Sequence, residues 1–212
     1  HCHINSSEFN KESLVFLFYL LEKLQKEIFE IIPLSRKENW ACKRFDKTIG
    51  FNIKGNEGFD EYKMKIDVCY DNLFYIYHGS SKIDKLHNKK YKHERGPKVG
   101  YDRKKMRYSW VNFVPALTKC REHDFYNNGI YTIEFRCHEG TFNFEKIKNW
   151  ILILMGIMHY VENNKNGILN NIKLTDIIKY SYPKTYEYLI KYIQERKSIY
   201  NKSIGNNDIN SC

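Results

Sequence analysis

The stretch Tyr131-Thr-Ile-Glu-Phe-Arg-Cys-His138 decides the fold, because it has the clearest β-strand pattern in the chain and is bounded by glycines. Side chains two positions apart lie on the same face of a strand. One face is therefore apolar and carries Ile133, Phe135 and Cys137. The other face is polar and carries Glu134, Arg136 and His138. This alternation predicts a strand over 130–138 that packs one face on a core and presents polar groups on the other.

A long amphipathic helix is predicted before this strand, over residues 11–32. Its apolar residues recur at alternating steps of three and four, which places them on one helical face: Leu14, Leu17, Leu21, Leu24, Ile28 and Ile31. Asn10 can cap the N-terminus, and Glu12 faces the positive end of the helix dipole. Pro33 is expected to end the helix.

Three further helices are predicted after the strand. The first covers residues 144–161, with Asn143 or Thr141 as its cap. Its expected buried face consists of Ile147, Trp150, Ile151, Leu154, Met158 and Val161. Helices over roughly 172–181 and 184–198 follow. Residues 201–212 are polar, and we expect a flexible tail there.

Three shorter segments, residues 1–6, 73–77 and 108–114, are predicted to add strands to the sheet. The chain shows no internal repeat, and 42% of its 212 residues are hydrophobic, which is enough to bury a core. These patterns predict an α+β fold, in which a curved antiparallel sheet has helices packed on one side. We expect one domain over residues 1–200.

The net charge of +10 is concentrated in one segment. Between Lys82 and Arg107 the chain has eleven basic and three acidic residues, which leaves a charge of +8 there. Glycines and a proline predict a long loop for residues 80–106, and long loops are often functional. Such a segment attracts polyanions, which include nucleic acid, nucleotide phosphates and acidic substrates.

The cysteines predict a reduced, intracellular protein. The six of them, at positions 2, 42, 69, 120, 137 and 212, form no Cys-x-x-Cys pair and match no zinc spacing. A chain with a hydrophobic core does not need disulfides, so we expect reduced thiols and a cytoplasmic location. The two apolar runs, at 14–21 and 151–157, are shorter than a membrane span, and no membrane partner is expected.

The polar face of the central strand has a counterpart in His1-Cys2-His3, where two imidazoles also share one face. A carboxylate and an imidazole on neighbouring strands can share a divalent metal with phosphate oxygens, and an arginine two residues along can hold a phosphate. The alternative is structural: Glu134 and Arg136 form a solvated pair on the strand, and His-x-His lies on the surface.

Several blocks of sequence support the first interpretation. They are His1-Cys-His-Ile4, Ser35-Arg-Lys-Glu-Asn39, Tyr108-Ser-Trp-Val-Asn-Phe113, Thr132-Ile-Glu-Phe-Arg-Cys-His-Glu-Gly-Thr-Phe-Asn143 and Phe144-Glu-Lys-Ile-Lys-Asn-Trp150. In this order they resemble the C-terminal part of the amidoligase family, which is related to glutamine synthetase and the glutamate–cysteine ligases. The resemblance covers the whole chain loosely and is specific over residues 107–150. It implies a glutamine synthetase-like catalytic domain that here lacks its N-terminal strands.

The resemblance also implies roles for individual residues. Glu134 and His1 match metal ligands, and His3 matches a neighbour that faces the nucleotide phosphates. Arg136, and more weakly Arg36, match arginines that contact the transferring phosphate. The remaining matches concern the substrate pocket, namely Asn112 and His138. The implied cofactors are ATP and Mg²⁺ or Mn²⁺, and the implied reaction joins a carboxylate to an amine through an acyl phosphate.

One departure from the family pattern concerns the metal. The relatives carry further metal-binding carboxylates on strands before His-x-His, and no residue precedes His1 here. A site with half its ligands binds metal weakly, so we expect the isolated 212-residue fragment to be inactive although its parent is an enzyme. The acid, the amine and the oligomeric state are not specified by the residues.

Two other classes stay open. The basic segment Lys82–Arg107, with Tyr91 and Tyr101 inside it, is compatible with a nucleic-acid-binding module, although no helix-turn-helix, zinc or RNP-type motif accompanies it. The third class is a non-catalytic remnant of a ligase, kept for packing or partner binding.

Overall fold

The computed structural model describes residues 1–37, 39–40, 42–45, 109–113, 116, 131–164 and 171–205. The strand predicted over 73–77, the basic segment Lys82–Arg107 and residues 206–212 lie outside these ranges. The described part is a mixed fold of helices and a small antiparallel sheet, as the predicted α+β class requires.

The central strand of the sheet is the predicted strand that carries Glu134. Among the described residues the sheet has three strands in the order β1-β3-β2, all antiparallel neighbours. β1 covers Cys2–Asn5, β2 covers Val111–Asn112 and β3 covers Thr132–Phe135. β3 is shorter than the predicted 130–138, because the chain leaves the sheet after Phe135 and turns toward the next helix. The alternation of faces that we expected through residue 138 therefore stops earlier.

The first long helix, α1 (Lys11–Glu30), forms where the leucine and isoleucine spacing predicted it. All six residues of the predicted stripe, from Leu14 to Ile31, are buried. The Asn10 side chain accepts a hydrogen bond from the Ser13 N–H at 2.9 Å and so caps the helix. The chain then passes Pro33 and makes one short turn of helix, α2 (Leu34–Lys37).

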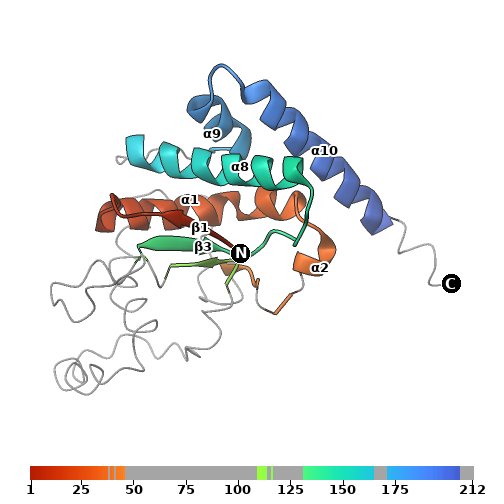
Figure 1. Cartoon of the computed structure of the whole chain (residues 1–212), viewed down its shortest axis with the longest axis horizontal. Helices are drawn as coiled ribbons and strands as arrows, with labels where there is room; N and C mark the ends of the chain where they lie inside the picture. The colour runs from red at the N-terminus through yellow and green to blue at the C-terminus, as the bar shows by residue number, and fades with distance from the viewer. Residues whose placement is uncertain are drawn as a thin grey trace.

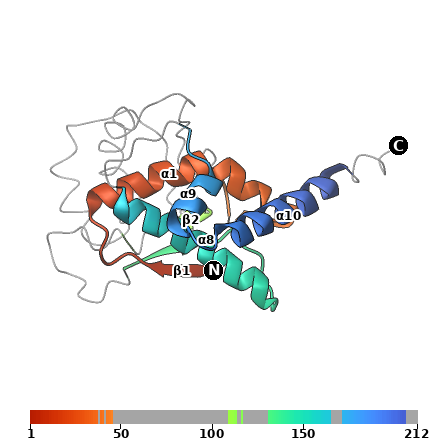
Figure 2. The ribbon, with the colours of Figure 1, turned by 90° about the horizontal axis from the view of Figure 1, so that it is seen from above.

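The helices α1, α8 (Phe144–Asn163), α9 (Leu174–Ser181) and α10 (Tyr186–Gly205) lie on one side of the sheet, whereas α2 lies beside its end (Figure 1). In Figure 1 α1 lies directly above the strands, α8 lies above α1, and α9 and α10 form the outer layer. Contacts of α8 with both α1 and α9 agree with this order. Figure 2 shows from above that α10 runs out past the end of α1 toward the C-terminus. The described part of the chain is thus compatible with the predicted α+β class.

The buried face of α8 differs from the predicted one. Trp150, Leu154, Met158 and Val161 are buried as expected. Ile147 and Ile151, however, are 40% and 37% exposed. Ile153 and Ile157 are completely buried in their place. The reason is tertiary, because α8 is packed between α1 and α9 and the positions of these two neighbours select the stripe.

A buried polar side chain ties α1 to the sheet region. Gln25 is 4% exposed, and its Oε1 accepts hydrogen bonds from the Phe45 N–H at 2.7 Å and from the Trp110 indole N–H at 3.1 Å. Trp110 is itself fully buried and packs against Phe29, Phe45 and Phe135. Because a buried amide oxygen needs donors, Gln25 fixes the position of α1 relative to Trp110.

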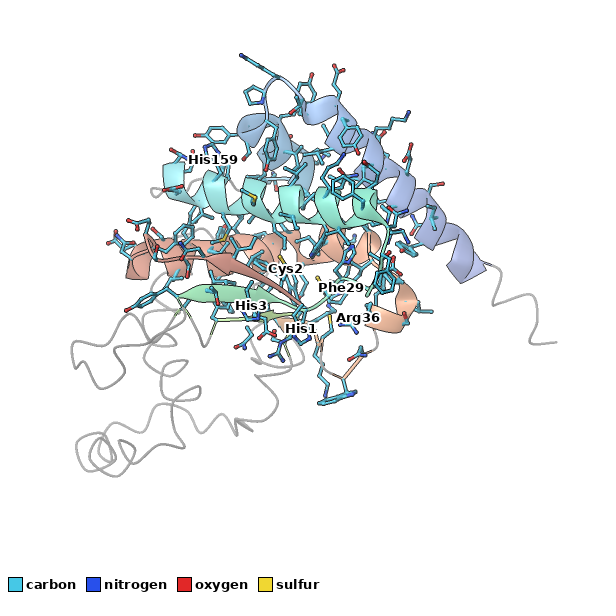
Figure 3. The ribbon with its side chains drawn as sticks, viewed as in Figure 1. His1, Cys2, His3, Phe29, Arg36 and His159 are labelled. Atoms are coloured by element: carbon cyan, nitrogen blue, oxygen red, sulfur yellow. The ribbon has the colours of Figure 1, made fainter. Side chains whose placement is uncertain are left out.

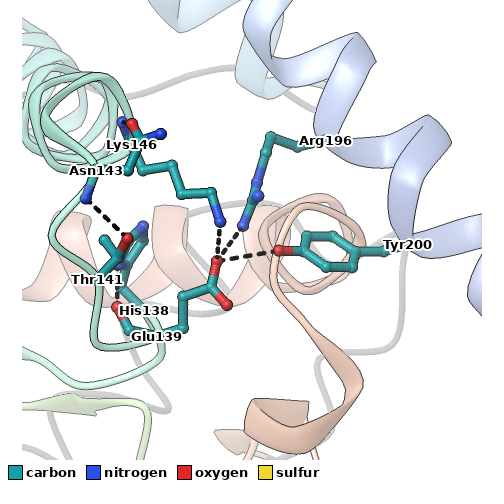
Figure 4. A network of polar contacts seen from close by, with 7 residues as sticks. All are labelled: His138, Glu139, Thr141, Asn143, Lys146, Arg196 and Tyr200. Carbon is teal, nitrogen blue, oxygen red and sulfur yellow. Dashed lines mark hydrogen bonds and ion pairs between the residues drawn. The ribbon is translucent and has the colours of Figure 1, made fainter.

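Glu139, in the connection from β3 to α8, fastens α10 to the rest of the molecule. Its Oε1 accepts hydrogen bonds from Lys146 Nζ at 3.0 Å, a guanidinium nitrogen of Arg196 at 2.8 Å and the Tyr200 hydroxyl at 3.2 Å (Figure 4). Burial alone raises the pKa of Glu139, but the hydrogen bonds from Arg196 and Lys146 outweigh it and hold this pKa below its usual value. The carboxylate is therefore ionised at neutral pH and holds two cations.

The last helix is longer than predicted. α10 continues to Gly205, whereas its end was expected at residue 198. Helix thus takes in residues 201–205 of the expected tail. The contact between Tyr200 and Glu139 lies in this added part and gives a physical reason for it.

Replacing Asn10 or Asn143 with alanine should lower the free energy of unfolding by about 1 kcal/mol each, because each side chain caps a helix. Asn143 accepts a hydrogen bond from the Lys146 N–H at 3.0 Å, as Asn10 does from Ser13. Urea denaturation followed by circular dichroism measures the change. Asn163→Ala is the control, because this asparagine lies in the last turn of α8 and bonds to the His159 carbonyl instead. Unchanged stability in both cap variants would contradict the prediction.

Candidate functional site

Glu134 is the centre of a polar cluster on the face of the sheet that points away from the helices. In the register of the sheet it lies opposite His3 of β1 on one side and opposite Asn112 of β2 on the other. The residue is only 6% exposed. Its Oε2 accepts hydrogen bonds from the Asn112 amide at 2.8 Å and from the Arg136 guanidinium at 2.7 Å. One carboxylate thus collects side chains from all three described strands.

The two imidazoles of β1 approach the other carboxylate oxygen. His1 Nδ1 is 2.6 Å from Glu134 Oε1, and His3 Nε2 is 3.8 Å from the same oxygen. The second ring nitrogen of His3 lies 3.1 Å from the Thr132 hydroxyl, which holds the ring in place. About half of each histidine side chain is exposed, 51% for His1 and 47% for His3. The carboxylate is therefore sheltered while the imidazoles face outward.

A second arginine joins the cluster from α2. A guanidinium nitrogen of Arg36 donates a hydrogen bond to the main-chain carbonyl of Arg136. The Nε of Arg36 is buried and has no hydrogen-bond acceptor among the described residues. Figure 3 places Arg36 and the two histidines together at the end of the sheet next to α2. Arg36 thus contacts the main chain at the end of β3, while the guanidinium of Arg136 binds Glu134.

The electrostatics keep the central carboxylate ionised. Burial alone raises the pKa of Glu134, but hydrogen bonds from Arg136 and Asn112 and the charge of Arg136 outweigh that effect. The pKa of Glu134 is therefore below its usual value. An ionised carboxylate with its oxygens already hydrogen-bonded does not need to be deprotonated before it binds a cation.

His138 does not join this cluster, contrary to the expected shared face. Its ring lies 5.2 Å from the Trp150 ring of α8, and its Nδ1 lies 2.7 Å from the Glu139 carbonyl. Burial lowers the pKa of His138, so its neutral form is favoured. The physical reason is the early end of β3, after which the chain turns toward α8. These contacts are those of a packed residue at the end of a strand, and they give a substrate role no support.

The side chains of the cluster are of the types that bind divalent metals, but their positions do not suit a metal ion. Within the described ranges, no group of three or more His, Cys, Asp or Glu side chains is arranged to hold a metal ion. His1 and Glu134 contact each other directly, whereas two ligand atoms on one ion lie about 3 Å or more apart. Imidazole suits transition metals and carboxylate suits Mg²⁺ and Mn²⁺, so Mn²⁺ fits this mixed set better than Mg²⁺ does.

Most of the residues predicted for the site are therefore brought together. The sheet gathers His1, His3, Asn112, Glu134 and Arg136, and α2 adds Arg36. Sequence reasoning missed Thr132, although it lies two residues before Glu134 and so on the same face.

Comparison with protein-family models, with curated proteins and with solved structures finds no match to this chain. The resemblance to amidoligases thus rests on the sequence blocks alone. In the described part of the chain, none of the helices combines the length and the apolar character that crossing a membrane requires.

Proposed function

We propose that this chain carries part of the active site of an ATP-dependent carboxylate–amine ligase of the amidoligase kind, with a glutamine synthetase-like catalytic domain. The observation that supports the proposal best is the sheltered, ionised Glu134, with two half-exposed imidazoles on one oxygen and an arginine and an asparagine on the other. A structural ion pair needs only one cation. It does not need two histidines that point outward from a neighbouring strand.

In this proposal Arg136 and Arg36 bind the phosphates of ATP. A guanidinium group binds a phosphate with two parallel hydrogen bonds and keeps its charge at any physiological pH. The carboxylate oxygen of the substrate attacks the γ-phosphorus of ATP, which gives an acyl phosphate and ADP. The amine then attacks the acyl carbon, the amide bond forms and inorganic phosphate leaves. The arginines stabilise the charge on the transferring phosphoryl group.

In the roles that the resemblance implies, His1 and Glu134 would hold a divalent ion that neutralises phosphate charge, and His3 would face the nucleotide phosphates. The direct contact between His1 and Glu134 would have to open for an ion to enter. Within the protein, Asn112 and Arg136 orient the Glu134 carboxylate through its Oε2. Thr132 orients His3. Outer contacts of this kind raise metal affinity by about 10-fold to 100-fold.

An acyl phosphate can be trapped, which gives a test that does not need the natural amine. The polypeptide is incubated with ATP, Mn²⁺, a mixture of amino acids and small dicarboxylic acids, and hydroxylamine. We expect ADP and a hydroxamate from an active ligase, in amounts that depend on the carboxylate mixture. The assay is run on residues 1–212 and on any longer reading frame that contains them.

The outcomes distinguish the three possible functions, namely a ligase, a nucleic-acid-binding module and a non-catalytic remnant. ADP and hydroxamate formation supports the ligase, and activity in residues 1–212 alone would contradict the expectation that the fragment is inactive. Salt-sensitive binding to random-sequence DNA, without ADP formation in any polypeptide, would favour the nucleic-acid alternative. Neither activity in any polypeptide would favour the non-catalytic remnant.

A further inference from the structure

The ring of His138 is held beside the polar contacts that fasten α10. It lies 5.2 Å from the Trp150 ring of α8, with an angle of 32° between the two ring planes. Its Nδ1 lies 2.7 Å from the Glu139 carbonyl. A carbonyl oxygen only accepts hydrogen bonds, so Nδ1 must carry the proton of the neutral ring. The other nitrogen, Nε2, is then the one that gains a proton in acid.

Nε2 of His138 lies in a place that does not suit a proton. This atom is buried, and none of the described residues forms a hydrogen bond with it. The neighbouring indole nitrogen of Trp150 is itself a donor and cannot accept from it. A protonated ring in this position would therefore bury both a charge and an N–H group without a protein acceptor, which costs free energy.

Three charged side chains act on the His138 ring, and two of them are cations (Figure 4). Glu139 belongs to the same connection, Lys146 to α8 and Arg196 to α10. The carboxylate of Glu139 already accepts hydrogen bonds from Lys146, Arg196 and the Tyr200 hydroxyl. A proton on His138 would add a third positive charge around this one carboxylate.

These surroundings favour the neutral ring. Burial lowers the pKa of His138, and the charges of Arg196 and Lys146 lower it further, although Glu139 opposes them. When the ring is released, it takes up a proton at a higher pH than when it is packed, so protonation favours the released form. The packed form is therefore fully favoured above the usual histidine pKa of about 6.5 and loses stability as the pH falls below it.

Only the end of α10 depends on Glu139. The first part of this helix is held in the core by Ile193, which is 1% exposed. Beyond it, Lys197 pairs with Glu30 of α1 at 2.9 Å, but these side chains are 29% and 34% exposed, and pairs of this kind contribute little. The hydrogen bonds that Glu139 accepts from α10 thus carry most of the attachment that the described contacts give to this end.

We propose that His138 is an acid-sensitive switch, which releases the end of α10 when its ring gains a proton. The charged ring leaves its buried position against Trp150, and Glu139 moves with it because it is the next residue in the chain. Its carboxylate then no longer holds Arg196, and the helix frays beyond Ile193. This device belongs to the fold and does not depend on the proposed ligase activity.

Hydrogen exchange measured by mass spectrometry tests the switch in the folded 212-residue chain. Labelling is carried out at about pH 7.5 and about pH 5, on either side of the usual histidine pKa, with times scaled to the intrinsic exchange rate at each pH. We expect the protection of the end of α10 to fall several-fold at the lower pH, relative to the protection of α1.

Two variants show whether His138 is responsible. His138→Gln should remove the pH effect, because a glutamine amide can still donate to the Glu139 carbonyl but gains no proton. His159→Gln is the matched control, since His159 is an exposed histidine of α8 that lies beside Tyr180. This control should keep the change seen in the wild type.

Two results would overturn the proposal. The first is unchanged protection of the end of α10 at about pH 5 in the wild type. The second is an equal loss of protection in the wild type and in His138→Gln, which would assign the effect to another group. Circular dichroism shows whether His138→Gln is folded. If it is not, the ¹⁵N NMR signals of the wild-type rings decide instead, because loss of protection at a pH where His138 stays neutral also refutes the switch.

Discussion

We expect Glu134→Gln to lower the turnover of the proposed ligase by about 100-fold, because it removes the charge that both imidazoles and Arg136 approach. Glutamine has nearly the same volume as glutamate, and its oxygen can still accept the hydrogen bonds of Asn112 and Arg136. The loss therefore reports the charge and not the shape of the site. Turnover is measured as hydroxamate formed per minute, in whichever polypeptide shows the activity.

The control for this variant is Glu145→Gln. Glu145 lies in the first turn of α8, its side chain is 56% exposed, and it forms its own ion pair with Lys148. Neutralising it makes the same chemical change outside the cluster and should leave turnover unaltered. If Glu134→Gln kept wild-type turnover, Glu134 would be a structural residue and the proposed site around it would be wrong.

We expect Glu139→Ala to destabilise the protein by about 2–3 kcal/mol, less than the loss for a fully buried ion pair, because the side chain of Glu139 is 26% exposed. The side chain of Arg196 is only 6% exposed, and without Glu139 its charge has no carboxylate among the described residues. Lys146 and Tyr200 lose the same acceptor. Because Glu139 joins the β3–α8 connection to α10, the helix should detach before the rest of the molecule unfolds. Urea denaturation measures the loss, and protease cleavage within α10 locates it.

Glu145→Ala is the matched control, because Glu145 also binds a lysine and a tyrosine, Lys148 and Tyr188, but on the surface. It should change stability little, since exposed ion pairs contribute little. The double variant Glu139→Gln with Arg196→Met removes both charges of the pair and should recover much of the loss. Equal stability of the Glu139→Ala and Glu145→Ala variants would contradict the role that we assign to Glu139.

Local sequence patterns predicted where helices and strands form better than they predicted which elements pack against one another. The stripe of α1 and the caps at Asn10 and Asn143 depend on residues within one helix, and these are where they were expected. The strand around Glu134 was also predicted with its two faces, because alternation is a local property. The family resemblance depends on the same local blocks, and it stays a prediction.

The wrong predictions concern features that are determined by contacts between residues far apart in the sequence. Ile147 and Ile151 have the spacing of a buried stripe, but α1 and α9 cover a different side of α8. His138 follows the alternation of the strand in sequence, yet Trp150 and the turn toward α8 determine where its ring lies. Residues 201–205 are polar and lack an apolar stripe, and Tyr200 next to them binds Glu139 far away in sequence.

By itself, the sequence determined the helices, the central strand and the polar face of Glu134 and Arg136, because hydrophobic period and capping act over a few residues. Only the tertiary structure decided that His1, His3 and Asn112 meet Glu134. The order and register of the strands make these contacts, and β1 and β3 are far apart in the sequence. The same holds for the contact of Arg196 with Glu139. These contacts come from packing the whole chain, and no short stretch of sequence contains both partners.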